Sequence, residues 1–390
     1  IFVPLPVDVN KTLMSIDLRD LDCDRKSLWK SILKRYPYGL KHDQYPDNKD
    51  INDLAEEIYD RAETRIPAIR ADWFISTASR PPLYHILLQL PTDAKVLEDR
   101  LKVDVKRNFL RGEVHRAGFN ASGVSNSNRL VERHDALHGA YWKSYDFLTS
   151  VGLGNLFVYP LGPDFHGNPF QRQAFRHDGG EIIFNLPNGF QGYMLVDAKD
   201  KRIDEGPIKV VHDRTKVSGT PLVVNGLSCM ACHMHGMIRF KDQIRAGHIL
   251  GGDPRKFLKR IYPEVSEMDR NLDKDEARFL RALEESTGEF LRVGKDKDLK
   301  ITEFPEPISA IARWYITEEL TVKDVSRELG LKDSRQLEGA ISANRRLQEL
   351  GLFPLSRGKK IKRELWEHTE FLLSPYQEAA AQLKLGTPVR

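Results

Sequence analysis

Four short segments rich in β-branched and aromatic residues interrupt a chain whose other parts carry helical patterns. They read NLFVYPLG, EIIFNLP, FQGYMLVDA and PIKVVHD, and they lie between residues 155 and 213. Asn188-Gly189 separates the second segment from the third, and this dipeptide favours a two-residue type I′ turn with positive φ at both positions. A second turn is expected from Asp197 to Lys201. The pattern predicts an antiparallel β-meander across residues 155–225.

Helical spacing of apolar residues marks the N-terminal third of the chain. In residues 51–66 the apolar side chains fall on one face, and Pro67 ends the pattern. Thr92 and Asp93 are expected to cap a second helical stretch that closes near Gly118. Residues 129–148, RLVERHDALHGAYWKSYDFL, also predict a helix.

Helical patterns return after residue 236. Thr321 and Asp324 form an expected capping box, and Gly330 is an expected helix stop. We therefore expect an α+β fold with helix in excess. Its regions would be a mainly helical part over 1–150, the meander and a cysteine motif over 151–250, and a helical part over 251–390, packed as one body.

The composition is that of an ordinary globular protein, with 40% hydrophobic and 30% charged residues among 390. A formal net charge of +4 is small for this length, so we expect no nucleic-acid partner. No apolar run reaches the roughly 18–20 residues that cross a bilayer, so no transmembrane segment is expected. The first residues, IFVPLPVDV, show no leader, and a removed leader would leave no trace here.

The sequence SCMACHMHGM, residues 228–237, holds two of the three cysteines, and we call it the cysteine motif. Cys229, Cys232 and His233 fit Cys-x-x-Cys-His, the attachment signature of c-type haem. Each thiol adds across one vinyl group of the porphyrin, and the histidine that follows serves as the proximal iron ligand. The motif therefore predicts one covalently bound haem c.

Three other interpretations of the motif remain open from the sequence. A zinc site needs four ligands, and beyond the motif only Cys23 remains as a thiol. A thioredoxin-like dithiol belongs to a βαβ unit, whereas the predicted surroundings are antiparallel. A structural pair of buried thiols is the third alternative. Cys23 itself is expected to be a small packing residue, with a reactive thiol or a cross-link as the alternative.

The motif CMACH resembles that of c-type cytochromes. The longer stretches NGLSCMACHMHGMI, FNLPNGFQGYMLVDA and RADWFISTASRPPLYH are similar to segments of large single-haem exported proteins of planctomycete-type bacteria. The resemblance implies haem, a helix-like segment after the motif and a periplasmic or otherwise extracytoplasmic location. It implies no particular activity.

The sixth iron ligand is the main unknown of the sequence. Met268, His134 and His85 are the candidates for this distal position. His134 and His138 are four residues apart, which would place both on one helical face and would also suit a divalent metal. The alternative interpretation of this pair is a solvated or hydrogen-bonded surface feature. His85 has a satisfied core histidine as its alternative interpretation, and Met268 a half-exposed side chain without a role. Met234, His235 and Met237 follow His233 too closely to reach the other face of a haem.

A second group of residues, Arg70, Asp72 and Trp73, resembles the polar and aromatic side chains of peroxidase-like sites. Its alternative is an Arg–Asp ion pair capped by a core tryptophan. The first functional hypothesis is an exported electron-transfer cytochrome with a redox partner protein. The second is a haem enzyme of peroxidase or oxidoreductase type, and the third is a ligand-sensing or interaction module.

The third hypothesis depends on the C-terminal region. LTVKDVSRELGL resembles the first part of a helix-turn-helix, and residues 357–363, RGKKIKR, form a basic run. Both features also occur in plain helical hairpins with a solvated face.

Overall fold

The computed structural model describes residues 5–6, 14–15, 26–41, 49–62, 65–66, 69–292, 294–369 and 373–389. The chain forms two compact units, which comprise residues 1–77 with 311–390 (unit 1) and residues 78–310 (unit 2). Helix exceeds strand among the described residues, so the expected α+β class is confirmed. Cys23 and Pro67 lie outside the described residues.

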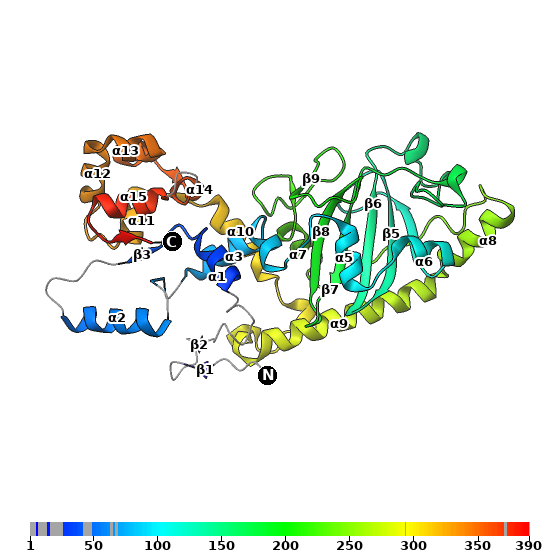
Figure 1. Cartoon of the computed structure of the whole chain (residues 1–390), viewed down its shortest axis with the longest axis horizontal. Coiled ribbons are helices and arrows are strands. Elements are labelled where there is room, and N and C mark those ends of the chain that lie inside the picture. Colours follow the sequence, from blue (N-terminus) through cyan, green and yellow to red (C-terminus); the bar gives the residue numbers. More distant parts are fainter. Residues whose placement is uncertain are drawn as a thin grey trace. The chain divides into compact units, whose positions relative to one another are not determined.

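Unit 2 is built on a five-stranded antiparallel sheet whose strands follow one another in chain order (Figure 1). These strands are β4 (His115–Asn120), β5 (Asn128–Ala136), β6 (Gly139–Asp146), β7 (Gly179–Asn185) and β8 (Gln191–Asp197). The predicted meander topology is confirmed, but its predicted position is wrong, because three strands precede residue 151. Residues 129–148, predicted as a helix, form the β5–β6 hairpin. The segments NLFVYPLG and PIKVVHD form turns and loops and contribute no strand to the sheet.

The turn between β7 and β8 lies where the sequence placed it but has another geometry. The backbone N–H of Leu186 donates to Phe190 (2.8 Å), and that of Gly189 donates to Leu186 (3.0 Å). Pro187 fits the second position of such a turn because its φ is fixed near −65°. Only Gly189 has positive φ (88°), so the predicted type I′ turn is wrong and a three-residue loop takes its place. The turn from Asp197 to Lys201 is confirmed.

The two faces of the sheet pack against different parts of unit 2. We call the face of Val131, Ser144, Glu181, Ile183 and Leu195 the motif face, because these residues border the cavity beside the cysteine motif. The other, or far, face packs against two helices, α5 (Ala94–Leu101) and α6 (Val105–Arg111). Tyr141 on β6 donates to Glu98 of α5, and His134 on β5 contacts Asn108 of α6.

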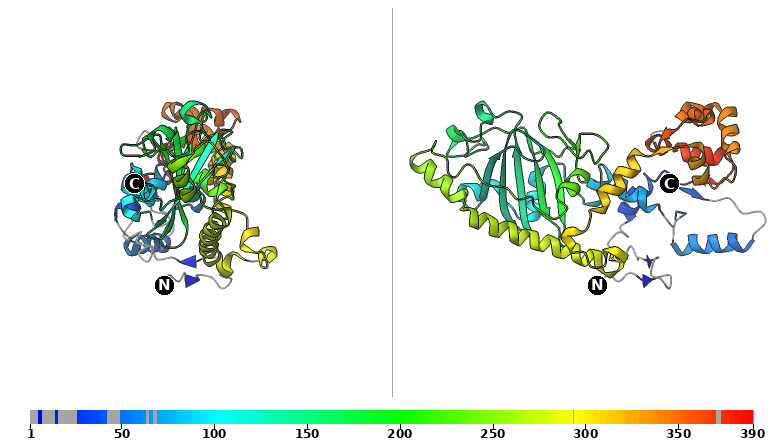
Figure 2. Two further views of the ribbon diagram at one scale, coloured as in Figure 1. Left: turned by 90° about the vertical axis from the view of Figure 1, so that its right-hand side faces the viewer. Right: turned by 180° about the vertical axis from the view of Figure 1, so that it is seen from behind.

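A long helix, α9 (Val265–Leu291), runs along one end of the strands, as Figures 1 and 2 show. Asp275 of this helix accepts hydrogen bonds from Arg133 of β5 and Trp142 of β6, two residues on the motif face of the sheet. The remaining elements of unit 2 are α4 (Leu83–Leu87), β9 (Glu205–Gly206), β10 (Val223–Val224), α7 (Leu227–Cys232) and α8 (Gly252–Ile261), with short 3₁₀ turns at Gly152–Gly154, Gln171–Gln173, Gly294–Asp296 and Ile301–Glu303.

Unit 1 consists mainly of short helices around buried charges. Its elements, of which α3 and α10 run across the boundary between the units, are β1 (Leu5–Pro6), β2 (Met14–Ser15), α1 (Lys26–Leu33), β3 (Leu40–Lys41), α2 (Lys49–Ala62), α3 (Ala71–Ala78), α10 (Pro307–Thr317), β11 (Glu319–Leu320), α11 (Val322–Glu328), α12 (Ser334–Ala343), α13 (Arg345–Leu347), the turns Gln348–Leu352 and Phe353–Arg357, β12 (Ile361–Lys362), α14 (Arg363–Trp366), α15 (Pro375–Gln382) and β13 (Thr387–Pro388). The capping box of Thr321 and Asp324 is confirmed at the start of α11. Arg363, the last residue of the basic run, is buried and pairs with Glu318 and Glu328.

No helix within the described ranges is both long and apolar enough to cross a membrane.

Candidate functional site

The cysteine motif begins on α7, a helix that the protein itself holds in place. The Ser228 hydroxyl accepts from the backbone N–H of Val224 (3.0 Å) and donates to the Asp213 carboxylate (3.2 Å). Asp213 also accepts three backbone N–H groups of the turn that follows it, those of Thr215, Lys216 and Val217. These bonds fix the first turn of α7 against a neighbouring loop.

The residue before α7 must be a glycine. Gly226 has φ +85°, and a Cβ there would lie 2.6 Å from the Ser79 carbonyl oxygen and 3.0 Å from the Tyr84 ring. Both obstacles are buried backbone or aromatic atoms that cannot move aside easily. The close approach therefore sets the direction in which the two cysteines leave the loop.

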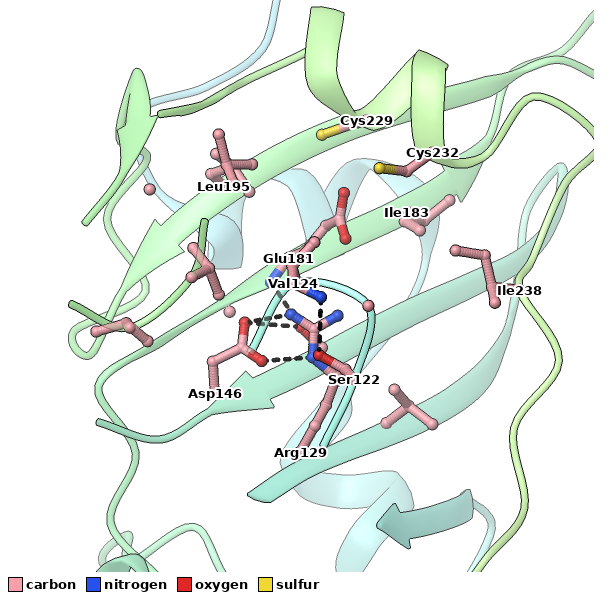
Figure 3. A pocket seen from close by; sticks show the side chains of 18 of the residues that line it. Ser122, Val124, Arg129, Asp146, Glu181, Ile183, Leu195, Cys229, Cys232 and Ile238 are labelled. Atoms are coloured by element: carbon pink, nitrogen blue, oxygen red, sulfur yellow. Dashed lines mark hydrogen bonds and ion pairs between the residues drawn. The ribbon is translucent and has the colours of Figure 1, made fainter. Parts of the chain in front are cut away.

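A cavity of about 400 Å³ lies between α7 and the motif face of the sheet. Its lining includes both cysteines, His233 and a largely apolar wall, of which Val124, Val131, Ile183, Leu195, Ile238 and Phe240 are members. Figure 3 shows Cys229 and Cys232 projecting from α7 toward the sheet, with the Glu181 carboxylate rising from β7 between the thiols and Arg129. Size and lining are those of a site for a small molecule or cofactor.

Both thiols are held in the protonated form. Burial raises the pKa of Cys229 well above its ordinary value, and the nearby Glu181 charge adds to the effect. Burial, followed by the charges of Glu181 and Asp213, raises the pKa of Cys232 to about 11. Reactive dithiols show the opposite shift, toward a thiolate at neutral pH. The surroundings therefore do not favour a redox dithiol.

His233 ends the helix with its two ring nitrogens in different settings. Its Nδ1 lies 3.1 Å from the Gly236 carbonyl oxygen, to which an Nδ1–H donates. Its Nε2 faces the cavity, 3.7 Å from Glu181 Oε2. A backbone carbonyl at one ring nitrogen is the usual way in which proteins orient a metal-binding histidine through the other. The ring lies beside that of Tyr193, with 6.0 Å between centroids.

The sheet brings three polar side chains to the floor of the cavity. Arg129 and Asp146 form a bidentate pair with N···O distances of 2.6 and 2.9 Å. Glu181 stands beside them on β7, and its backbone N–H donates to the Ser144 hydroxyl (2.8 Å). Burial alone would raise the pKa of Glu181, but its interactions with His233 and Arg129 lower it to about 2.

Comparison with known proteins adds nothing to this geometry. No family model, curated protein or solved structure matches the chain.

The chemistry of the donor set fits a haem c. Two thiols from one helical turn and an imidazole oriented through its Nδ1 open into the same apolar cavity. A zinc site would need four ligands. In the part of the chain that the structure describes, no three His, Cys, Asp or Glu side chains lie together as a metal-holding group.

The structure places the three distal candidates away from the cavity lining. His134 points from the far face of the sheet, because Leu130, Glu132 and His134 alternate with the residues of the motif face. His85 is buried and its Nε2 lies 2.7 Å from Asn225 Nδ2, so it is a satisfied core histidine. Met268 is buried in α9 among core residues.

Further expectations about individual residues are corrected. His134 and His138 share no helical face, since the first lies in β5 and the second in the turn after it. The helix expected after the motif is wrong as well, because residues 234–245 form turns and loops. Met237 lies on this segment and borders the cavity.

Arg70, Asp72 and Trp73 lie in unit 1 and form the ion pair with a core tryptophan that was their alternative interpretation. Arg70 Nη2 lies 2.7 Å from Asp72 Oδ2, and its Nη1 lies 2.8 Å from Glu328 Oε1. Trp73 is 2% exposed and packs edge-on against Tyr36. Their side chains are engaged in structural contacts.

Sequence reasoning did not identify Glu181, Arg129 or Asp146 as cavity residues. A signal was present for Glu181, which precedes the apolar run IIF and shares a strand face with Ile183. No local pattern marks Arg129 and Asp146, whose pairing depends on the register of β5 against β6.

Proposed function

We propose that this chain is a single-haem c-type cytochrome that transfers electrons. Cys229 and Cys232 would hold the porphyrin through thioether links, and His233 would bind the iron through Nε2. The haem would supply one-electron redox chemistry, and the protein would supply orientation, a dry environment and control of the axial ligands.

One observation carries this proposal. The two thiols and the Nε2 atom of the His233 ring open into one cavity that is large, mainly apolar and lined by the sheet. A covalently held planar cofactor needs this combination, whereas a structural pair of thiols needs no cavity beside it.

The edge of the cavity near the motif reaches the surface. Cys232 is only half-buried, and Met234 and Ile238 are 40% and 54% exposed. An exposed apolar rim at this edge supports electron exchange with a redox partner protein, because such partners meet over small contact areas. Attachment of haem c implies an extracytoplasmic location, most simply the periplasm.

The proposal is tested by producing the full chain together with a c-type maturation system. A pyridine haemochrome with the spectrum of two thioether links, at one haem per chain, is expected. The Cys229→Ala/Cys232→Ala variant should yield protein without covalent haem. Absence of the haemochrome in the wild-type chain would overturn the proposal.

A haem enzyme of peroxidase or oxidoreductase type is the second candidate, favoured by the polar pair of Arg129 and Asp146 inside the cavity. It requires an iron that binds peroxide or other small ligands readily. A ferric spectrum unchanged by cyanide and a ferrous spectrum unchanged by CO would exclude this candidate and retain the electron carrier.

A further inference from the structure

The sheet carries a carboxylate directly across the cavity from His233. Glu181 lies on β7, on the motif face, and its Oε2 is 3.7 Å from His233 Nε2. Its side chain is 14% exposed and that of His233 is 9% exposed. Figure 3 shows the carboxylate directed toward the two cysteines, away from the Arg129–Asp146 pair.

This carboxylate interacts with the His233 ring and with the Cys229 thiol, and a thioether link at Cys229 would remove the hydrogen that this thiol donates. Among the described residues, His233 is the one basic side chain within 4 Å of it. A glutamate is seldom buried without a cation, because desolvation of its charge costs several kcal/mol. Arg129, whose guanidinium lies on the cavity floor, is already bound on two nitrogens by Asp146. A positive charge placed between Glu181 and His233 would satisfy both groups.

Four other ligand-type side chains that border the cavity are held by other groups or lie on the segment of the motif itself. The Lys143 ammonium lies 2.7 Å from Asp200 on the far face of the sheet, and Asp213 binds the backbone N–H groups of its turn. Asp178 accepts the backbone N–H of Leu148. Met237 follows His233 by four residues on the same segment. Glu181 remains as the donor that faces the imidazole.

We infer that Glu181 supplies the sixth iron ligand, a carboxylate oxygen opposite His233. The inference rests on the proposed haem c function and names the group that this function leaves open. Bonds from a transition metal to imidazole nitrogen and carboxylate oxygen are each about 2.0–2.2 Å, as for zinc, so two opposite ligands lie about 4 Å apart. The 3.7 Å between Nε2 and Oε2 is close to this span. An anionic ligand stabilises the ferric state and lowers the reduction potential.

The experiment compares four haem-loaded full-length chains: wild type, Glu181→Leu, Glu181→His and the control Asp178→Asn. Asp178 also borders the cavity, and asparagine preserves its acceptor role toward Leu148. Each chain is first assayed for the pyridine haemochrome. Ferric optical and EPR spectra, imidazole affinity and the reduction potential are then measured.

Loss of the carboxylate in Glu181→Leu should change the ferric spectrum, raise the affinity for imidazole at least 10-fold and shift the potential to a more positive value. Glu181→His should give the low-spin spectrum of two histidine ligands, while Asp178→Asn should match the wild type. A wild-type spectrum with methionine or bis-histidine ligation would overturn the inference. The inference would also be overturned if both Glu181 variants had the ferric spectrum and the imidazole affinity of the wild type. In either case a positive haemochrome in the wild-type chain leaves the proposed haem c function intact. Absence of the haemochrome from the wild-type chain would instead overturn that function.

Discussion

Removal of the Asp275 carboxylate should cost unit 2 much of its stability. Asp275 is 2% exposed and accepts three hydrogen bonds, from Arg133 Nε (2.8 Å), Arg133 Nη2 (3.1 Å) and Trp142 Nε1 (2.9 Å). Loss of one partner from a buried ion pair costs about 3–5 kcal/mol, because the remaining charge stays buried without compensation. Arg133 would retain Asp135, 2.8 Å away, so we expect the lower end, about 3 kcal/mol, for Asp275→Ala.

Asp273 provides a matched control two residues away on the same helix. It pairs with Arg239 (2.5 Å), but Asp273 is 62% exposed and Arg239 49% exposed. Arg239 also keeps Glu276 as a second partner. Exposed pairs of this kind contribute about 0–1 kcal/mol, so Asp273→Ala should be nearly neutral. Both substitutions introduce alanine into α9, so helix propensity changes alike in the two variants.

Hydrogen exchange followed by mass spectrometry measures this difference in peptides from α9, β5 and β6. A loss of about 3 kcal/mol should accelerate exchange of their most protected amides about 100-fold in Asp275→Ala. The midpoint of thermal unfolding of unit 2 should fall by roughly 6–12 °C. Equal effects of the two substitutions would refute the assignment of α9 anchoring to this buried pair.

Three further predictions concern the site and its supports. Gly226→Ala should cost roughly 1–3 kcal/mol of stability and lower the yield of covalent haem several-fold, measured by haemochrome per chain, because its Cβ would meet the Tyr84 ring. Burial raises the pKa of Glu98 to about 7, so the stability that this group contributes is present below about pH 4.5 and is lost as pH rises through 7. In urea unfolding, the free energy of unfolding of Glu98→Gln should therefore increase relative to that of the wild type, by up to about 3 kcal/mol, as the pH rises from about 4.5 to 7. In the haem-free chain at pH 8, iodoacetamide should label Cys232 slowly and Cys229 more slowly still; rapid labelling of both would contradict their raised pKa values.

The sheet shows how far the sequence could predict the fold. β7 and β8 were predicted because their strands are apolar on both faces and a glycine turn joins them. The sequence of β5 and β6 instead predicts a helix, because charged residues such as Glu132 and Arg133 obscure the alternation of apolar and polar positions. In the structure these charges are buried and paired: Glu132 with Arg116 of β4, and Arg133 with Asp275 of α9. Partners more than 15 residues away decide the burial, so no local pattern could reveal it.

The candidate site, too, could be predicted from the sequence only in part. Cys229, Cys232 and His233 were predicted as the haem-binding residues because the attachment chemistry needs a fixed local spacing, which a sequence displays directly. The group opposite His233 was not identified, because it comes from a strand about 50 residues earlier and is brought there by sheet register. His134, a predicted distal ligand, lies on the far face of the sheet, because an error in secondary structure changes which face a residue occupies.

Contacts of the protein with itself hold the cysteine motif at the wall of the cavity. Ser228 is bound to Asp213, Gly226 is packed against Tyr84, and the His233 ring is oriented by Gly236, all through contacts of the protein with itself. Metal-dependent small domains differ, since their ligands become ordered only when the metal binds. In this chain the positions of the two thiols are set by a large sheet and its loops. Folding of unit 2 would therefore contribute to ordering the motif to which a haem would be attached.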